Sequence, residues 1–368
     1  MSSRKDKFSS KDKNYMRLAL NLAKAHKGLT GDNPSVGCVI TKNDKIISIG
    51  KTGHNGRPHA EHNAIKNSIE KLSGSKMYVT LEPCNHYGKT PPCTNIIIRN
   101  KISELIYSME DIDKKVKGKS FKILTNKKIN VKKGLLKEEA KSLYDSYIKN
   151  RHKKLPFVTG KIAVSKNKLI YSKGTKRITA KSSDKLTHYL RYKNDSIMIS
   201  SKTLNIDNPK LNCRLKGYEK FSPKRIILDK NLEIKLGSYV FKSSKKNNTI
   251  LFYNSSNNKK IRILKKKGII LIKSHLDTKG LFDLKIILKK LFGLGVRNLL
   301  IEGGDKITKN FIKNKLIDIF YLFQSTKILA KNKVNQSFTS FKILNKNYNK
   351  KKNFSTDLAK DSITIYKR

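Results

Sequence analysis

The first 150 residues alternate between helical and strand-like patterns of apolar and polar residues. A helix near the start is marked by apolar residues three and four positions apart, namely Met16, Ala19, Leu20 and Ala23. Asp12 is a candidate cap for the start of this helix. Further patterns predict strands at 36–40, 46–49, 77–80 and 105–107 and helices at 59–72 and 138–148. This alternation of strands and helices predicts an α/β domain.

The pattern breaks near residue 150 and then starts again. Residues 150–154 are polar and basic, and Pro156 restricts the residue before it to extended conformations. We therefore expect a first domain over 1–149 and a second over 150–368. In the second, the pattern predicts strands at 156–164, 196–200, 225–229, 250–253, 268–272 and 298–301 and helices at 182–191 and 281–292. Glu302-Gly303-Gly304 opens a further helix, so this domain is also α/β.

Composition adds one unusual property, the charge. The 368 residues suffice for two domains of roughly 150 residues each. The chain has 82 Lys and Arg against 27 Asp and Glu, a formal net charge of +55, which by itself favours nucleic-acid binding. The basic residues are spread along the whole chain beside Asn and Ile, however, whereas a nucleic-acid surface is more often one dense block. We interpret the excess as the product of an AT-rich coding sequence and expect no nucleic-acid partner; tight retention of bulk RNA on nitrocellulose at physiological salt would contradict this.

The sequence also indicates where in the cell the protein is located. Residues 1–13 are polar and show no secretory signal, and no apolar run approaches the ~18 residues of a membrane span. The most apolar stretch, 316–323, is short and interrupted by Asp318. Four cysteines in a long chain without an export signal favour thiols or metal ligands over disulfides. We expect a cytoplasmic protein without a membrane partner.

The first domain holds the residue types of a catalytic zinc site. Glu61 follows His59 by two residues, and Cys84 and Cys93 come after a predicted strand. One imidazole and two thiolates provide three ligands and leave a fourth position for water, whose pKa zinc lowers. Glu61 would then carry a proton from that water to a leaving amine. Two other interpretations stay open, which are ordinary buried cysteines and a structural zinc site with His86 as the fourth ligand.

This set of residues resembles the zinc-dependent cytidine-deaminase superfamily, whose usual signature spaces its two cysteines two residues apart. Here eight residues separate Cys84 from Cys93, and residues 33–39 read Asn-Pro-Ser-Val-Gly-Cys-Val. Both features are similar to the riboflavin-biosynthesis deaminases in particular. The resemblance implies an N-terminal α/β/α domain of cytidine-deaminase type with one Zn²⁺ per chain. It also implies substrate contacts from Asn33 near the base and from His86 and Lys89 near the phosphate or the pyrimidine.

Two segments of the second domain carry a pattern. One is 203–214, Thr-Leu-Asn-Ile-Asp-Asn-Pro-Lys-Leu-Asn-Cys-Arg, in which Asp-Asn-Pro alone would indicate only a turn. The other is Glu302-Gly303-Gly304 between an apolar strand and a helix, where paired glycines let backbone amides approach a phosphate or form a plain tight turn. Since a full G-x-G-x-x-G is missing, a Rossmann domain is not indicated.

Together these segments resemble the reductase half of the bifunctional riboflavin-biosynthesis deaminase-reductases, a domain similar to dihydrofolate reductase. The resemblance implies NADPH binding by Ala163, Arg177, Thr203, Asp207, Gly304, Asp305 and Lys306. It implies substrate binding by Lys161, Thr175, Arg191, Leu211, Arg214 and Glu302. Arg191 and Arg214 suit a ribose-linked phosphate, because a guanidinium can donate two parallel hydrogen bonds to it.

The chain departs from that family's usual sequence in three places. Ser165-Lys166-Asn167-Lys168 stands where Ser-Leu-Asp-Gly is usual, and Arg177 stands where a tryptophan is usual. Residues 325–330, Ser-Thr-Lys-Ile-Leu-Ala, replace a more usual Pro-Lys-Leu-Leu-Gly. The first departure removes a turn glycine, and the second places a cation at the expected cofactor site.

The resemblance implies a bifunctional enzyme of riboflavin synthesis. Zinc-dependent hydrolytic deamination of 2,5-diamino-6-(5-phosphoribosylamino)pyrimidin-4(3H)-one would be followed by NADPH-dependent reduction of the ribosyl chain to ribityl. The partner is then a small phosphorylated pyrimidine, and a homo-oligomer is plausible by family resemblance only. Two alternatives are a tRNA base deaminase with a basic C-terminal RNA-binding part and a zinc-stabilised nucleic-acid-binding protein. The cysteine spacing and the 203–214 segment both speak against the tRNA deaminase.

Overall fold

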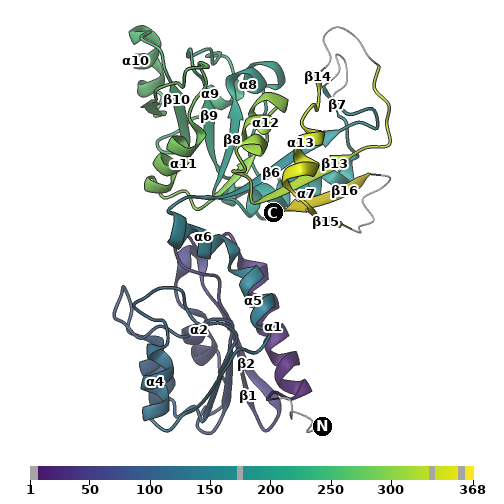
Figure 1. The fold of residues 1–368 in the computed structure, drawn as a ribbon. Coiled ribbons are helices and arrows are strands. Elements are labelled where there is room, and N and C mark those ends of the chain that lie inside the picture. The colour runs from purple at the N-terminus through teal and green to yellow at the C-terminus, as the bar shows by residue number, and fades with distance from the viewer. Residues whose placement is uncertain (1–6, 172–176, 331–335, 355–360) are drawn as a thin grey trace. The chain divides into compact units, whose positions relative to one another are not determined.

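The computed structural model describes residues 7–171, 177–330, 336–354 and 361–368. It divides into two compact units, Met1–Lys154 and Leu155–Arg368 (Figure 1), and each is described by itself. In the described ranges no helix combines the length and the apolar character needed to cross a membrane. Thr175, one of the predicted substrate contacts, lies outside the described residues.

The first unit is built on a five-stranded sheet in the order β2-β1-β3-β4-β5. β1 is antiparallel to both of its neighbours, while β3, β4 and β5 are parallel. The strands are β1 (Gly37–Lys42), β2 (Lys45–Lys51), β3 (Lys76–Val79), β4 (Glu104–Tyr107) and β5 (Asn130–Lys133). The helices are α1 (Ser10–His26), η1 (His54–Gly56), α2 (Ala60–Lys66), α3 (Cys93–Arg99), α4 (Lys119–Asn126), α5 (Lys137–Leu143) and α6 (Asp145–Lys153).

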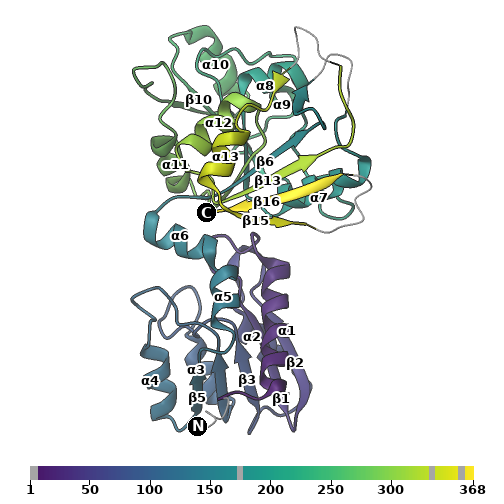
Figure 2. The same cartoon turned by 45° about the vertical axis from the view of Figure 1, so that its right-hand side comes forward.

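Helices cover both faces of this sheet (Figure 2), which confirms the predicted α/β/α architecture. Helix α1 packs on β1 and against α5, whereas α2 packs on β2 and against α3. Two glycines allow these close approaches. A Cβ on Gly37 would lie 1.9 Å from the backbone oxygen of Ala19 in α1, and one on Gly50 would lie 2.2 Å from that of Ala60 in α2. Both helices therefore pack directly on strand backbone, which fixes the start of α2 close to the sheet.

Three details of the first unit differ from the sequence prediction. The N-terminal cap of α1 is Ser9 and not Asp12; the Ser9 hydroxyl accepts from the Asp12 N–H, and the Asp12 carboxylate accepts from the Ser9 N–H. Helix α2 ends at Lys66, because the chain turns away there, leaves Ile69 93% exposed and returns to bury Leu72. The helix predicted at 138–148 is two helices, α5 and α6, which meet at Tyr144.

The second unit is built on a nine-stranded sheet in the order β11-β10-β9-β8-β12-β6-β13-β16-β15. All neighbours are parallel up to β13, and the last two pairs are antiparallel. The strands are β6 (Phe157–Val164), β8 (Ser196–Ser200), β9 (Lys224–Leu228), β10 (Thr249–Tyr253), β11 (Ile270–Lys273), β12 (Asn298–Ile301), β13 (Ile319–Gln324), β15 (Lys350–Asn353) and β16 (Ser362–Lys367). A separate pair joins β7 (Leu169–Tyr171) to β14 (Gln336–Ser337).

Alternating residues of the central strands fill hydrophobic cores on opposite faces of this sheet. Met198 belongs to one core, while its neighbours Ile197 and Ile199 belong to the other. The helices are α7 (Lys181–Tyr192), α8 (Ser201–Asp207), η2 (Glu219–Phe221), α9 (Tyr239–Lys242), α10 (Asn258–Lys266), α11 (Leu284–Gly293), α12 (Asp305–Lys313) and α13 (Phe341–Asn347). Strands β8 and β12 have the predicted bounds, and the other predicted strands are shifted by no more than two residues at either end.

Candidate functional site

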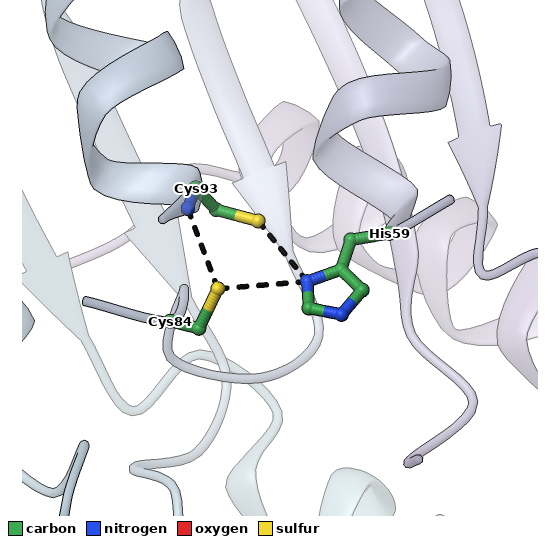
Figure 3. Close-up of side chains that lie close together, drawn as sticks. All are labelled: His59, Cys84 and Cys93. Atoms are coloured by element: carbon green, nitrogen blue, oxygen red, sulfur yellow. Dashed lines mark hydrogen bonds between the residues drawn. The ribbon is translucent and has the colours of Figure 1, made fainter. Parts of the chain in front are cut away.

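The sharpest cluster in the first unit is formed by His59, Cys84 and Cys93. His59 directly precedes α2, Cys84 lies in the loop after β3, and Cys93 is the first residue of α3. Figure 3 shows the imidazole and the two thiols turned toward one another. The His59 Nδ1 lies 3.3 Å from the Cys93 Sγ and 3.5 Å from the Cys84 Sγ, and one ligand atom from each residue lies within 4.8 Å of the other two. Three elements thus bring one nitrogen and two sulfurs to one point.

The surroundings of the two sulfurs favour a thiolate. The thiol of Cys93 donates a hydrogen bond that, with further help from His59, lowers the pKa of Cys84 to about 4. The N–H of Cys93, at the start of α3, also donates to the Cys84 Sγ over 3.3 Å. The same sulfur contact, together with burial, raises the pKa of Cys93. Soft thiolates and an imidazole held this close are the donor set that zinc prefers, so these residues fit the predicted ion.

Glu61 is the second residue of α2 and lines the same cavity as His59 and Cys84. The cavity is lined by His59, Glu61 and Cys84 together with Asn33 and His86. The Glu61 side chain is 4% exposed, and burial raises the pKa of its carboxyl group. A buried carboxyl group with a raised pKa can take up a proton and release it again, as acid–base catalysis requires.

Only some of the substrate-binding residues predicted for the first unit line this cavity. Asn33 lines the cavity while its amide donates to the Gly56 carbonyl over 2.9 Å. His86 also lines the cavity, whereas Lys89 is exposed on the loop between the cysteines and is not among the lining residues. The prediction for Lys89 therefore has no geometric support in the structure.

Several other residues that line this cavity are not indicated by any sequence motif. They are Thr52, Arg57, Thr90, Asp111, Tyr147 and Arg151. Arg57 donates to the Thr90 hydroxyl and so ties the loop between the cysteines to the segment before α2. Arg151 of α6 lies over the Tyr147 ring at 5.4 Å, and the Tyr147 hydroxyl donates to Asp111. Arg57 could have been noticed from its place two residues before His59, whereas the others carry no local signal.

A second cavity lies in the other unit, at the carboxyl ends of β6, β8 and β12, where open parallel sheets usually bind ligands. It brings together most of the residues expected to bind cofactor and substrate, which are Lys161, Ala163, Arg177, Arg191, Thr203, Asp207, Leu211, Glu302, Gly304, Asp305 and Lys306. Arg214 lies in an adjoining pocket lined by Arg191, Pro209 and Lys210. Residues from five separate segments thus meet at one edge of the sheet.

Arg191 and Glu302 form a buried ion pair at this edge. The Arg191 Nε donates to one carboxylate oxygen of Glu302 over 2.9 Å, and its Nη2 donates to the other over 2.7 Å. Burial alone would raise the pKa of Glu302, but the charge of Arg191 outweighs it and lowers that pKa. Lys161 lies nearby with its Nζ over the Phe323 ring at 4.9 Å, and burial lowers its pKa. The site therefore holds a fixed charge pair beside a lysine whose proton is held less tightly than usual.

The second cavity also contains the start of α12, which follows Glu302 in the chain. Gly304 directly precedes this helix, and its N–H donates to the Thr203 hydroxyl over 3.3 Å. A Cβ on Gly303 would lie 2.1 Å from Ile307, so only glycine fits there, and one on Gly304 would project toward Thr203. Because Gly303 and Gly304 have no side chains, the phosphates of a dinucleotide can approach the backbone N–H groups at this helix start. The site therefore fits the predicted NADPH.

Two predicted cofactor contacts are already engaged within the protein. Arg177 pairs with Asp184 over 2.9 Å. The Asp305 carboxylate accepts from the N–H and hydroxyl of Thr339 and from the hydroxyl of Ser340. Asp305 therefore joins the start of α12 to the segment before α13, whatever it contacts in the cavity.

Each unit matches a known domain family. Residues 9–109 match the cytidine and deoxycytidylate deaminase zinc-binding region, and residues 160–360 match the RibD C-terminal domain. The riboflavin biosynthesis protein RibD of Aquifex aeolicus (strain VF5) is 38% identical over 87% of this chain and 88% of its own. The chain belongs to the RibD family. The RibD of Actinobacillus pleuropneumoniae is 32% identical over 87% of this chain and 85% of its own.

Solved structures of the RibD family share the whole fold. The structure of Acinetobacter baumannii RibD superposes with a TM-score of 0.83 at 26% identity and covers 97% of this chain and 98% of its own. A deaminase/reductase from Thermotoga maritima superposes with a TM-score of 0.80 at 30% identity, with the same coverage. The predicted family, the two fold types and the cofactors Zn²⁺ and NADPH are confirmed. A tRNA base deaminase is not favoured, because the second unit matches the RibD reductase domain.

Proposed function

We propose that this chain catalyses two consecutive steps of riboflavin biosynthesis, a hydrolytic deamination of the phosphoribosylamino-pyrimidine and an NADPH-dependent reduction of its ribosyl chain. We assign the deaminase to residues 1–149 and the reductase to 150–368. The observation that carries the proposal is the His59, Cys84 and Cys93 cluster beside buried Glu61, in a chain whose other unit matches the RibD C-terminal domain. The Thermotoga maritima protein is named for the same two activities, a diaminohydroxyphosphoribosylaminopyrimidine deaminase and a 5-amino-6-(5-phosphoribosylamino)uracil reductase.

In the deaminase, His59, Cys84 and Cys93 would hold the zinc ion. When bound, zinc supplies a Lewis acid that lowers the pKa of a water molecule. Glu61 takes a proton from the attacking water and delivers it to the amino group that leaves as ammonia, so one water is consumed for each ammonia released. The raised pKa of Glu61 suits this role, because the carboxyl group must keep the proton between the two transfers. Asn33 and His86, which line the cavity, would bind the pyrimidine and its phosphate, and Lys89 of the exposed loop would join them by family resemblance.

In the reductase, NADPH supplies the hydride. Thr203, Asp207 and the start of α12 at Gly304 would bind the dinucleotide, together with Ala163, Arg177, Asp305 and Lys306. Leu211, Arg214, Thr175 and the Arg191–Glu302 pair would bind the deaminated substrate. Lys161 can exchange a proton with the substrate, because its pKa is lowered and the residue lines the same cavity.

The proposal also covers partners and compartment. The substrate is a small phosphorylated pyrimidine, and nucleic acid is not required by either cavity. Cys38, Cys84, Cys93 and Cys213 form no disulfide in the described residues, which supports a reducing compartment such as the cytoplasm.

Glu61→Ala tests the deaminase assignment. We expect ammonia release to fall by at least 10³-fold, because the proton carrier is removed, while bound zinc stays near one per chain. Glu70→Ala, on the exposed segment after α2, is the matched control and should keep full activity. Unchanged ammonia release in the Glu61 variant would exclude the enzymatic role of this site.

A further inference from the structure

Helix α7 holds the loop that carries Arg214. His188 and Arg191 lie about one turn apart on the buried face of the helix, and they are 7% and 8% exposed. The His188 Nδ1 accepts from the backbone N–H of Arg214 over 3.2 Å, and its carbonyl accepts from the Cys213 thiol at 3.6 Å. The Arg191 Nη1 donates to the Asn212 carbonyl over 3.1 Å. Three consecutive loop residues are therefore bound to one helix.

This binding also orients the side chain of Arg214. The Arg214 Nη1 donates over 2.9 Å to the amide oxygen of Asn212, the residue whose carbonyl Arg191 holds. Arg214 is exposed and borders the pocket that it shares with Arg191. The position of its guanidinium thus depends on where the Asn212–Arg214 backbone lies.

The loop needs such anchors because its backbone is not in a relaxed conformation. Asn208 and Leu211 have φ angles of 40° and 55°, a left-handed region that costs free energy for residues other than glycine. Leu211 is also buried, so the loop cannot relax without exposing an apolar side chain. Contacts with α7 offset this cost and keep one loop conformation dominant.

Only a neutral imidazole can accept the Arg214 N–H, since both ring nitrogens carry protons in the charged form. Four charged groups act on His188: Arg191 and Arg214 disfavour its protonation, while Glu302 and Asp184 favour it. Burial and the two arginines prevail and lower the pKa of His188 to about 4. The ring is therefore neutral near pH 7, with the Nδ1 lone pair directed at the loop.

We propose that His188 is a positioning residue of the reductase, which places Arg214 for the phosphate of the phosphorylated ribose chain. The inference rests on the proposed role of Arg214 in substrate binding. It assigns a function to a residue that does not line the cavity and would not touch the substrate.

His188→Asn and His188→Gln form a matched pair. Both side chains are neutral and polar, but only asparagine puts an acceptor oxygen where the Nδ1 lies. We expect the Gln variant to raise the KM for the deaminated pyrimidine about tenfold, with kcat and the KM for NADPH within about twofold, because one anchoring hydrogen bond is lost. The Asn variant should stay within about threefold of the parent protein. Ammonia release by the first unit is an internal control in each preparation, and Tyr189→Phe, on the exposed face of α7, is an external one.

Arg214→Ala separates the inference from the proposal on which it rests. If Arg214→Ala leaves the substrate KM unchanged, the assigned role of Arg214 is wrong and the inference falls with it. If Arg214→Ala raises the KM but the Gln and Asn variants behave alike, only the inference is overturned. When His188→Gln is added to Arg214→Ala, we expect no further rise in KM, because the residue acts through Arg214. An additive effect in the double variant would contradict the inference.

Discussion

The chemistry of the first unit depends on the state of two sulfurs. Cys84 and Cys93 are held in one cluster with His59, but their pKa values are shifted in opposite directions. The cluster therefore has one ready thiolate and one thiol that must lose its proton when a metal binds. These ligands were predictable from sequence because their residue types and order follow one short motif. Arg57, Asp111 and Arg151 were not, because they reach the same cavity from segments without a recognisable pattern.

Cys84→Ala should remove both zinc and deamination. We expect bound zinc to fall below about a tenth of an ion per chain and ammonia release to become undetectable, because two protein ligands hold zinc far more weakly than three. Reduction of the already deaminated pyrimidine should continue, since its site lies in the other unit. Cys213→Ala is the control for zinc content by atomic absorption. Retention of stoichiometric zinc by the Cys84 variant would show that the ligands are assigned wrongly.

His188 also makes stability depend on pH. In the unfolded chain its pKa is near 6.5, whereas in the folded protein it is about 4. As the pH falls from 6.5 toward 4, His188 binds a proton in the unfolded state but not in the folded state. The free energy of unfolding therefore decreases over that pH range. His188→Asn cannot be protonated, and its urea midpoint should fall less than that of the parent protein between pH 7 and pH 4.5. Parallel declines in the two proteins would contradict the lowered pKa.

At the scale of elements, the sequence predicts what burial imposes and misses what only neighbouring elements impose. The buried runs of β8 and β12 were found with their observed bounds, because a central strand must be apolar on both faces. The division of one predicted helix into α5 and α6 has no such signal. Strand β15 is fully exposed and lysine-rich, and it is a strand only because it pairs with β16. Propensity and periodicity give no indication of it.

The turn before β7 shows how the chain tolerates a departure from its family. Lys168 stands where glycine is usual and has a φ of 64°, while the Ser165 hydroxyl accepts from the Leu169 N–H to close the turn. The Lys168 ammonium lies over the Phe341 ring at 4.7 Å, which offsets part of the conformational cost. The turn closes here without a glycine.

Comparing Lys168→Gly with Lys168→Ala measures the free-energy cost of the left-handed backbone conformation at residue 168. Both remove the contact with Phe341, but only glycine adopts the left-handed conformation without strain. We expect the glycine variant to have the higher free energy of unfolding by about 1 kcal/mol in urea titrations. An alanine variant at least as stable as the glycine variant would mean that the turn relaxes to another shape.

At the scale of the whole molecule, the chemistry is carried by a few placed groups and not by the net charge of +55. Each proposed cavity takes a small anionic ligand, and a few cations at defined positions suffice to bind one. The excess of lysine could still speed the capture of such ligands through long-range attraction that salt would screen. The two units perform consecutive steps on one phosphorylated intermediate, which gives their fusion an obvious use.

The measurement that tests this account most directly is incubation of the purified, zinc-loaded protein with the diaminopyrimidine substrate, with and without NADPH. The account predicts that ammonia is released in both reactions and that NADPH is oxidised only in the second, after deamination and in an amount that does not exceed the ammonia released. NADPH oxidation without prior ammonia release, or no ammonia from zinc-loaded protein, would contradict it.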